Sequence, residues 1–249
     1  ILLIPKAICL YVVLNPMSFR LTPHRFFSAN PAGTDWVCGD LHGEFDLLQT
    51  ALASSGIDPL VDRLFLLGDV IDRGPQSRAL LEWALVTPWV YSVIGNHELL
   101  MIAGAGEPSL KARHRAIGGE WVDQLDPATH RSLATRCRQS WPLTITLAHG
   151  DDQVGLVHAQ SPARNWGDVQ ASPYTRAFAM DCTWPWDRAQ GGHHPVEGVT
   201  AVVSGHIGTD RVIRKANQVW IDTLARTGQV PLMPVSQILA WVNEEARHE

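Results

Sequence analysis

Five short apolar segments, each followed closely by a residue type that binds metal ions, constrain the fold of this chain most strongly. Apolar runs of this length, bounded by glycine, are typical of buried strands. Ligands of open α/β sheets bind at the carboxyl ends of the strands, so we expect these polar residues to meet in one site. The segments are residues 36–38, 64–67, 90–94, 154–157 and 201–205, and the polar residues are Asp40, His42, Asp69, Asn96, His158 and His206.

The first three segments are separated by stretches with the apolar spacing of helices, residues 44–55 and 76–86. Alternation of this kind, with short connections, predicts three parallel strands with right-handed crossovers. The ligand spacing agrees, because Asp69 follows Asp40 by 29 residues and Asn96 follows Asp69 by 27, each about one βαβ unit. The chain is therefore predicted to belong to the α/β class.

The rest of the chain is predicted in less detail. Residues 110–140 indicate two or three helices with breaks at 118–119 and 126–127, and residues 143–158 indicate a hairpin. Residues 160–198 are predicted to form long loops with a short helix near 174–180. Strands over 199–204, 218–222 and 232–242 would then build a second, mostly antiparallel sheet packed against the first.

Composition limits the partners and the compartment. The net charge is −5 and no basic run occurs, which disfavours nucleic acid as a partner. The four cysteines, at 9, 38, 137 and 182, have neither disulfide-framework nor zinc-knuckle spacing, so we expect reduced thiols and a cytoplasmic protein. Because the candidate ligands extend from Asp40 to His206, a single domain over residues 17–249 is predicted.

Residues 1–16 form an apolar N-terminal extension of uncertain purpose. The stretch is short for a membrane span. It also lacks the basic region that precedes the apolar run of a signal peptide. Met17 opens a more usual start, so upstream translation or a mis-set start is the preferred interpretation. A short export or membrane-tethering segment is the alternative, and no membrane partner is expected without it.

The residue types suit a pair of divalent ions. Asp40 and His42 can turn toward one ion, and the two oxygens of Asp69 can bridge two ions. Mixed nitrogen and oxygen ligation suits Mn, Fe or Zn better than Mg or Ca. His97 need not be a ligand, because Asp72 can orient it as a general acid, and Arg73 can bind phosphate oxygens. Any one of these residues alone would more often be a cap, a turn or a packed side chain, but together they predict a site.

The motifs GDLHG (39–43), GDVIDRG (68–74) and GNHE (95–98), followed by spaced HA and GH, closely resemble the PPP family of metallophosphoesterases. The likeness is greatest to small bacterial and phage serine/threonine protein phosphatases of the phage lambda type. It extends from Trp36 to the C-terminus and includes GGEWVDQLD (118–126), WPWDR (184–188) and ANQVWIDT (216–223).

The resemblance implies a β-sandwich of two mixed sheets flanked by helices, holding two divalent ions, usually manganese in vitro. It implies hydrolysis of phosphoprotein by direct attack of hydroxide on phosphorus, with no phosphoenzyme. The implied first-metal ligands are Asp40, His42 and Asp69, and the implied second-metal ligands are Asp69, Asn96, His158 and His206. The implied catalytic residues are His97 as acid paired with Asp72, and Arg73 and Arg188 on the phosphoryl group.

The chain departs from its relatives at Gln160, at Ile207-Gly208 and at Leu224, where they tend to have Gly or Asp, Thr-Pro and Gly. These positions affect the loops around the second metal and the substrate rim. Two alternatives therefore stay open, a hydrolase of diadenosine tetraphosphate and a non-catalytic scaffold. The dinucleotide branch tends to lack the Asp-Arg pair found at 72–73 and to have Asp where Glu98 stands, so the protein phosphatase is favoured. The remaining histidines with no such context are predicted to be surface or loop residues, namely His114, His130, His149, His193 and His194.

Overall fold

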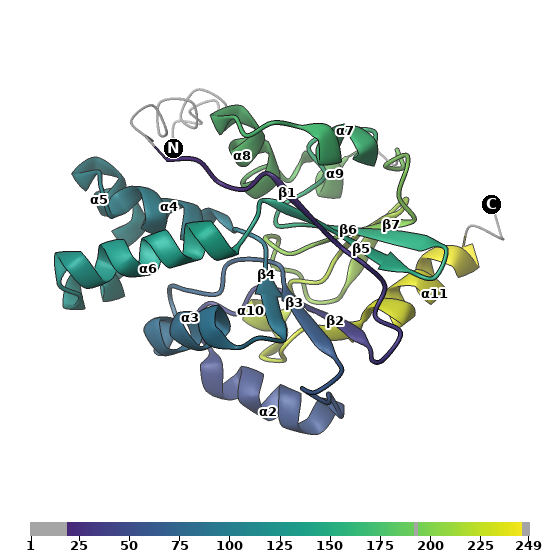
Figure 1. The fold of residues 1–249 in the computed structure, drawn as a ribbon, viewed down its shortest axis with the longest axis horizontal. Coiled ribbons are helices and arrows are strands. Elements are labelled where there is room, and N and C mark those ends of the chain that lie inside the picture. The colour runs from purple at the N-terminus through teal and green to yellow at the C-terminus, as the bar shows by residue number, and fades with distance from the viewer. Residues whose placement is uncertain (1–18, 192–193, 246–249) are drawn as a thin grey trace.

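The computed structural model describes residues 19–191 and 194–245, so the apolar extension 1–16 lies outside the described residues. Two mixed sheets flanked by helices form the fold, as predicted (Figure 1). The smaller sheet has the strand order β10 (Leu232–Pro234), β2 (Asp35–Cys38), β3 (Arg63–Leu66), β4 (Val90–Ser92). The larger sheet has the order β1 (His24–Phe27), β5 (Thr144–His149), β6 (Asp152–Val157), β7 (Ala201–Ser204), β9 (Gln218–Trp220), β8 (Ile213–Lys215).

The βαβαβ unit predicted for the first half of the chain is confirmed. Strands β2, β3 and β4 pair in parallel, with α2 (Phe45–Ser55) and α3 (Ser77–Val86) in the crossovers. Gly56 ends α2 at φ 80, a left-handed conformation that glycine adopts without the steric cost of a Cβ. The parallel arrangement brings the carboxyl ends of all three strands to the same edge of the sheet.

The second sheet differs from the prediction in two ways. It is not mostly antiparallel, because β1–β5, β6–β7 and β7–β9 pair in parallel and only β5–β6 and β8–β9 pair antiparallel. The strand predicted over 232–242 ends at residue 234, where α11 (Val235–Glu245) follows, and it pairs antiparallel with β2 in the smaller sheet instead of joining the second sheet. Val235, Ile238, Leu239 and Val242 recur at helical spacing and are buried, so the period of the apolar residues favoured a helix there.

The core between the two sheets follows from the alternation of side chains along the strands. On β3, Phe65 packs between the sheets, whereas Leu64 and Leu66 belong to the apolar cluster shared with the helices. On β7, Val203 packs between the sheets and Val202 joins the helical cluster. Both sheets are therefore covered on both faces, which suits runs of continuously apolar residues.

The helices form the outer layers. In Figure 1, α2 and α3 lie on one side of the strands, and α7 (Trp166–Ala171), α8 (Arg176–Thr183) and α9 (Asp187–Gln190) lie on the opposite side. The predicted helical stretch contains α5 (Pro108–Arg115), the 3-10 helix η1 (Glu120–Gln124) and α6 (Pro127–Ser140). Of these, α5 and α6 pack on α4 (Asn96–Gly104). The short helix α10 (Leu224–Thr227) begins at one of the positions that depart from the relatives. None of the helices in the described ranges is long and apolar enough to cross a membrane.

Candidate metal centre and active site

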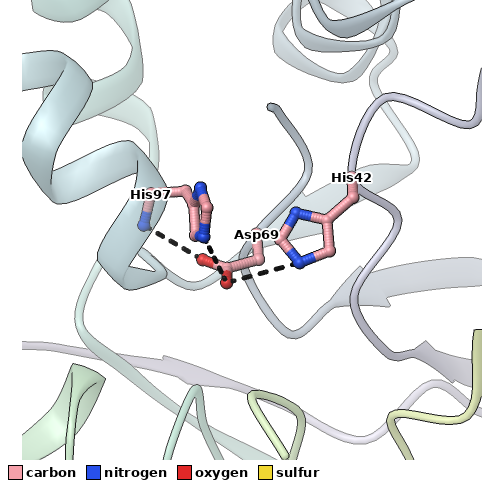
Figure 2. Close-up of side chains that lie close together, drawn as sticks. All are labelled: His42, Asp69 and His97. Carbon is pink, nitrogen blue, oxygen red and sulfur yellow. Dashed lines mark hydrogen bonds and ion pairs between the residues drawn. The ribbon is translucent and has the colours of Figure 1, made fainter. Parts of the chain in front are cut away.

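Asp69 lies at the centre of the candidate site, where the chain leaves β3. Its Oδ1 is 3.4 Å from Nε2 of His158, and its Oδ2 is 3.8 Å from Nε2 of His42 and 3.7 Å from Nε2 of His97. Figure 2 shows the carboxylate of Asp69 between the rings of His42 and His97. The two oxygens thus face histidines on opposite sides, as a carboxylate that bridges two cations requires.

The backbone of the site is strained. Among the described non-glycine residues, six have positive φ, and five of them are site residues: His42, Asp69, Asp72, Arg73 and His206. Non-glycine residues in this region cost on the order of 1–3 kcal/mol each and persist only where the surrounding structure fixes them. Their concentration in three strand-end loops, those after β2, β3 and β7, indicates a functional site rather than a set of ordinary turns.

Glu98 fixes the loop that carries Asp69. Its carboxylate is fully buried and accepts four backbone N–H groups, those of Asp69 (2.8 Å), Val70 (2.9 Å), Ile71 (3.3 Å) and Gly95 (3.0 Å). Burial, and then the negative charge of Asp69, raise the pKa of Glu98 to about 7. Sequence analysis used Glu98 only to compare family branches and missed this structural role.

The histidines of the larger sheet meet Asn96 from the smaller sheet. Nδ1 of His158 donates to the carbonyl of Leu67 (2.7 Å), and Nε2 of His206 donates to the carbonyl of Trp184 (3.1 Å). The inner nitrogens, Nε2 of His158 and Nδ1 of His206, are 3.2 Å apart, and Asn96 Oδ1 is 2.9 Å from the former. With the ring hydrogens directed outward, three lone pairs converge, which is the arrangement a cation satisfies.

His42 and Asp40 face Asp69 from the end of β2. Nδ1 of His42 donates to the carbonyl of Ile71 (3.1 Å), which leaves Nε2 to face the carboxylates, 4.0 Å from Asp40 Oδ2. Burial lowers the pKa of His42 and of His206 to about 4, so both rings are neutral at physiological pH and each has one unprotonated nitrogen. Both oxygens of Asp40 accept the backbone N–H of His206, at 3.0 and 3.1 Å, so the ends of β2 and β7 are joined.

Asp222 is an acidic residue of the site that sequence analysis missed. It follows β9 and is buried, and it lies close enough to Asp40 to hydrogen-bond with it. Burial, and then the charges of Asp222 and Asp69, raise the pKa of Asp40 well above its usual range. The signal was present in the motif ANQVWIDT, which was used for the resemblance and given no role.

Asp72, His97 and Arg73 form the second part of the site. Nδ1 of His97 donates to Asp72 Oδ2 at 2.7 Å, and both side chains are buried. Arg73 is exposed, and its guanidinium contacts Nε2 of His42 (2.8 Å) and Nε2 of His97 (3.1 Å). The predicted pairing of His97 with Asp72 is thus geometrically correct, and Arg73 lies over both imidazoles on the solvent side.

The predictions for His114 and His130 as surface or loop residues are wrong. His114 is fully buried on α5, and its Nε2 is 2.9 Å from Asp72 Oδ1. His130 is buried on α6, where its Nε2 donates to the carbonyl of Met101 (3.0 Å). Both helices pack on α4, and this tertiary packing buries polar positions that have no motif in the sequence. His149 ends β5 half-buried and His194 is exposed, while His193 lies outside the described residues.

Arg188 makes its hydrogen bonds to a neighbouring loop and not to the other candidate site residues. Its Nε and Nη2 donate to the carbonyls of Ser161 (3.1 Å) and Ala163 (3.0 Å), and its backbone N–H donates to Oε1 of Gln160 (2.9 Å). Within the described residues, none of its hydrogen bonds reaches the six candidate ligands. Gln160, one of the departures from the relatives, thus holds the loop of Arg188 in place.

The donor set fits divalent cations. Among the described residues, two groups have ligand atoms within 4.8 Å of one another, His42 with Asp69 and His97, and Asp69 with His158 and His206. Asp40, Asp69 and Asp222 concentrate buried carboxylates that a bound cation would neutralise. Imidazoles whose outward ring nitrogens donate to backbone carbonyls, such as those of His42, His158 and His206, would supply the nitrogen ligands. The first group includes His97, so the geometry permits this residue to act as a ligand as well as an acid.

Comparison with known proteins finds similarity to phosphoesterases. A family model described as calcineurin-like phosphoesterase matches residues 36–210. Serine/threonine-protein phosphatase 2 of Escherichia coli (strain K12) is 31% identical over 195 residues, which cover 76% of this chain and 86% of that protein. A symmetrical bis(5'-nucleosyl)-tetraphosphatase of Dechloromonas aromatica (strain RCB) is 42% identical over 127 residues, which cover 50% of this chain and 42% of that protein.

Solved structures share the fold. A protein serine/threonine phosphatase from Saccharomyces cerevisiae aligns with a TM-score of 0.57 at 17% identity, over 87% of this chain and 76% of that one. A cold-active protein-tyrosine phosphatase of a psychrophilic Shewanella aligns with a TM-score of 0.52 at 15% identity, over 86% of this chain and 77% of that one. At these identities the alignments support the two-sheet architecture alone.

Proposed function

The chain belongs to the calcineurin-like phosphoesterase family, and from this premise we propose that it is a serine/threonine protein phosphatase. As a member of this family it is a metallophosphoesterase, an enzyme that hydrolyses phosphate esters with the help of divalent metal ions. The proposal adds the substrate class, phosphoserine and phosphothreonine in proteins, with phosphotyrosine as a second class to test. A cytoplasmic location and one domain over residues 17–249 are part of the same proposal.

We assign the ligands as predicted, with two manganese ions as the preferred metals and Fe or Zn as alternatives. Asp69 would be shared by both ions, because its two oxygens face different histidines. Asp40 and His42 would complete the first site, and Asn96, His158 and His206 the second. When bound, the ions supply hydroxide near neutral pH and neutralise charge on the phosphoryl oxygens.

The side chains beside this centre suit the protonation of a leaving oxygen. Asp72 holds Nδ1–H of His97, so Nε2 of the ring faces outward to the place where Arg73 lies. A proton held at Nε2 can pass to the oxygen of the departing serine or threonine. Arg73 is exposed and can turn its planar guanidinium toward two phosphoryl oxygens, a bidentate contact that lysine cannot copy. The role of Arg188 as a second phosphoryl ligand stays a prediction.

The observation that carries the substrate assignment is the Asp72–His97 pair at 2.7 Å, next to Arg73. An alkoxide is a poor leaving group, and a positioned acid makes its departure easier. The curated relatives of Escherichia coli and Salmonella typhimurium, at 31% and 33% identity over 76% of this chain, are also serine/threonine-protein phosphatases. Net charge of −5 argues against a nucleic-acid substrate.

Hydrolysis of diadenosine tetraphosphate is the second candidate. The 42% identity to the Dechloromonas protein, over 127 residues or 50% of this chain, supports it. The loops around the second site, which contain Gln160 and Ile207-Gly208, can redirect a site of the same chemistry to another phosphate ester. The two candidates therefore differ in substrate and agree in mechanism.

The deciding experiment measures phosphate release by the purified protein with Mn²⁺ from phosphoserine and phosphothreonine peptides and from diadenosine tetraphosphate. We expect a higher kcat/KM on the peptides. A preference for the dinucleotide would replace the proposal by the second candidate. Absence of turnover on either substrate in the metal-loaded protein would contradict both and support a scaffold.

Two variants test the assigned roles. Asp69→Asn should abolish activity on every substrate, because the shared ligand is lost. His97→Asn should slow turnover and leave the metal content, measured by elemental analysis, largely unchanged. Loss of metal in the His97 variant would mean that the ring is a ligand, as its proximity to His42 and Asp69 permits.

A further inference from the structure

We propose that His114 and Trp121 are positioning residues, which hold the carboxylate of Asp72 so that His97 stays aligned with the leaving oxygen. The inference deepens the proposed function and rests on it, because alignment matters only if His97 protonates that oxygen. His114 is fully buried and Trp121 is half-buried. His114 lies in the last turn of α5 and Trp121 lies in η1, so both come from the segment 114–121 that connects these two helices.

Three ring N–H groups converge on the one carboxylate. His97 donates to Asp72 Oδ2 at 2.7 Å, and Trp121 donates to Oδ1 at 2.7 Å. Nε2 of His114 lies between the two oxygens, 2.9 Å from Oδ1 and 2.8 Å from Oδ2. The hydroxyl of Ser77 accepts the backbone N–H of Asp72 at 2.9 Å. With donors on both oxygens, the carboxylate cannot rotate away from His97 without breaking a buried hydrogen bond.

A pair of glycines places this segment against the site. Gly118 has φ +110, and its carbonyl accepts the backbone N–H of Arg73 at 3.0 Å. A Cβ on Gly119 would lie 2.5 Å from two ring atoms of His114, so the imidazole lies flat on this glycine. The motif GGEW (118–121) therefore positions Arg73 and the two donors to Asp72 from one turn.

The buried nitrogen of His114 that has no partner is a second, independent observation. Nδ1 of this ring is one of four buried side-chain polar atoms without a hydrogen bond in the described residues. An unsatisfied buried polar atom costs stability and calls for an explanation. An apolar residue would avoid that cost, so the ring is better explained by the bond that its other nitrogen makes to Asp72.

The test compares His114→Gln, which retains a donor near the position of Nε2, with His114→Leu, which removes it. Each is assayed on a phosphoserine peptide and on p-nitrophenyl phosphate, whose p-nitrophenolate departs without a proton. We expect His114→Leu to lower kcat on the peptide about tenfold, a part of what a general acid contributes, and to change kcat on p-nitrophenyl phosphate far less. KM and metal content should be unchanged, and His114→Gln should recover most of the loss. Trp121→Phe should show the same selective effect.

Nuclear magnetic resonance of ¹⁵N-histidine-labelled, metal-free protein gives a readout that does not depend on activity. The Nδ1–H signal of His97 should move in His114→Leu and return in His114→Gln. Equal loss on both substrates, equal behaviour of the Gln and Leu variants, or an unmoved His97 signal would overturn the inference. If the wild-type protein prefers the dinucleotide, the proposed function fails, and the His97 signal still decides whether His114 acts on the pair. If His114→Leu does not fold, Trp121→Phe decides the kinetic test.

Discussion

Glu98→Gln tests whether one buried carboxylate holds the loop on which the metal centre depends. In the wild-type protein, Oε2 accepts the N–H groups of Asp69 and Gly95, and Oε1 accepts those of Val70 and Ile71. A glutamine has one acceptor oxygen and one NH₂ group. Whichever way the amide is oriented, one pair of backbone donors faces other donors.

The expected loss follows from that count. Two buried N–H groups lose their acceptor, and each unsatisfied group costs about 1–3 kcal/mol. Glu98→Gln should therefore lower the free energy of unfolding by roughly 2–6 kcal/mol, a large part of the 5–15 kcal/mol typical of a folded domain. The substitution hardly alters side-chain volume, so packing contributes little to the difference.

Urea denaturation of the metal-free protein, followed by tryptophan fluorescence and circular dichroism, measures the change. Glu82→Gln is the matched control, because Glu82 pairs with Arg78 on the surface of α3. The side chain of Arg78 is 55% exposed and that of Glu82 is 41% exposed. A Glu98→Gln variant as stable as Glu82→Gln would refute the claim that the four hydrogen bonds fix the Asp69 loop. Loss of metal affinity in the same variant is expected, since Asp69 would no longer be held in place.

Three further predictions concern stability. Asp35→Asn should lower the free energy of unfolding, measured by urea denaturation, by about 3 kcal/mol, because it breaks a buried bidentate pair with Arg63 in which both contacts are 2.7 Å. A loss smaller than that caused by breaking an exposed ion pair would contradict this expectation. Burial lowers the pKa of His24 from 6.5 to about 4, so folding stability is fully present above pH 6.5 and declines as the pH falls toward 4 while the unfolded chain takes up the proton. His24→Asn should remove that part of the acid sensitivity, and identical profiles of melting temperature against pH for the two proteins would argue against it. A chelator should lower the melting temperature of the manganese-loaded wild-type protein and leave that of Asp69→Asn nearly unchanged, whereas equal shifts would indicate binding elsewhere.

The candidate ligands could be predicted from the sequence because each follows a local pattern. Asp69 and His158 come soon after the apolar strands β3 and β6. Parallel pairing of β3 with β2, and of β6 with β7, brings the carboxyl ends of neighbouring strands together within each sheet. The dyad of Asp72 and His97 was predictable because both belong to recognisable motifs. The period of the apolar residues and the spacing of the motifs are properties of short segments, so they can be recognised without knowledge of the tertiary structure.

The contacts that were missed depend on packing angles. His114 lies 42 residues from Asp72 in sequence and meets it only because α5 packs on α4 and the Gly118-Gly119 turn directs the chain back. His130 is buried for a similar reason. The strand predicted over 232–242 is wrong beyond Pro234, because Val235, Ile238 and Val242 have helical spacing and form the buried face of α11.

The two sheets contribute ligands to the same centre, and this has a mechanical consequence. Asp40, Asp69 and Asn96 follow strands of the smaller sheet, and His158 and His206 follow strands of the larger one. An ion held by both groups would act as a reversible cross-link between two sheets that otherwise contact each other through side-chain packing. Metal loading should therefore couple the opening of the two sheets. In hydrogen exchange, the amides of the two sheets should become accessible independently in the metal-free protein and together in the metal-loaded protein.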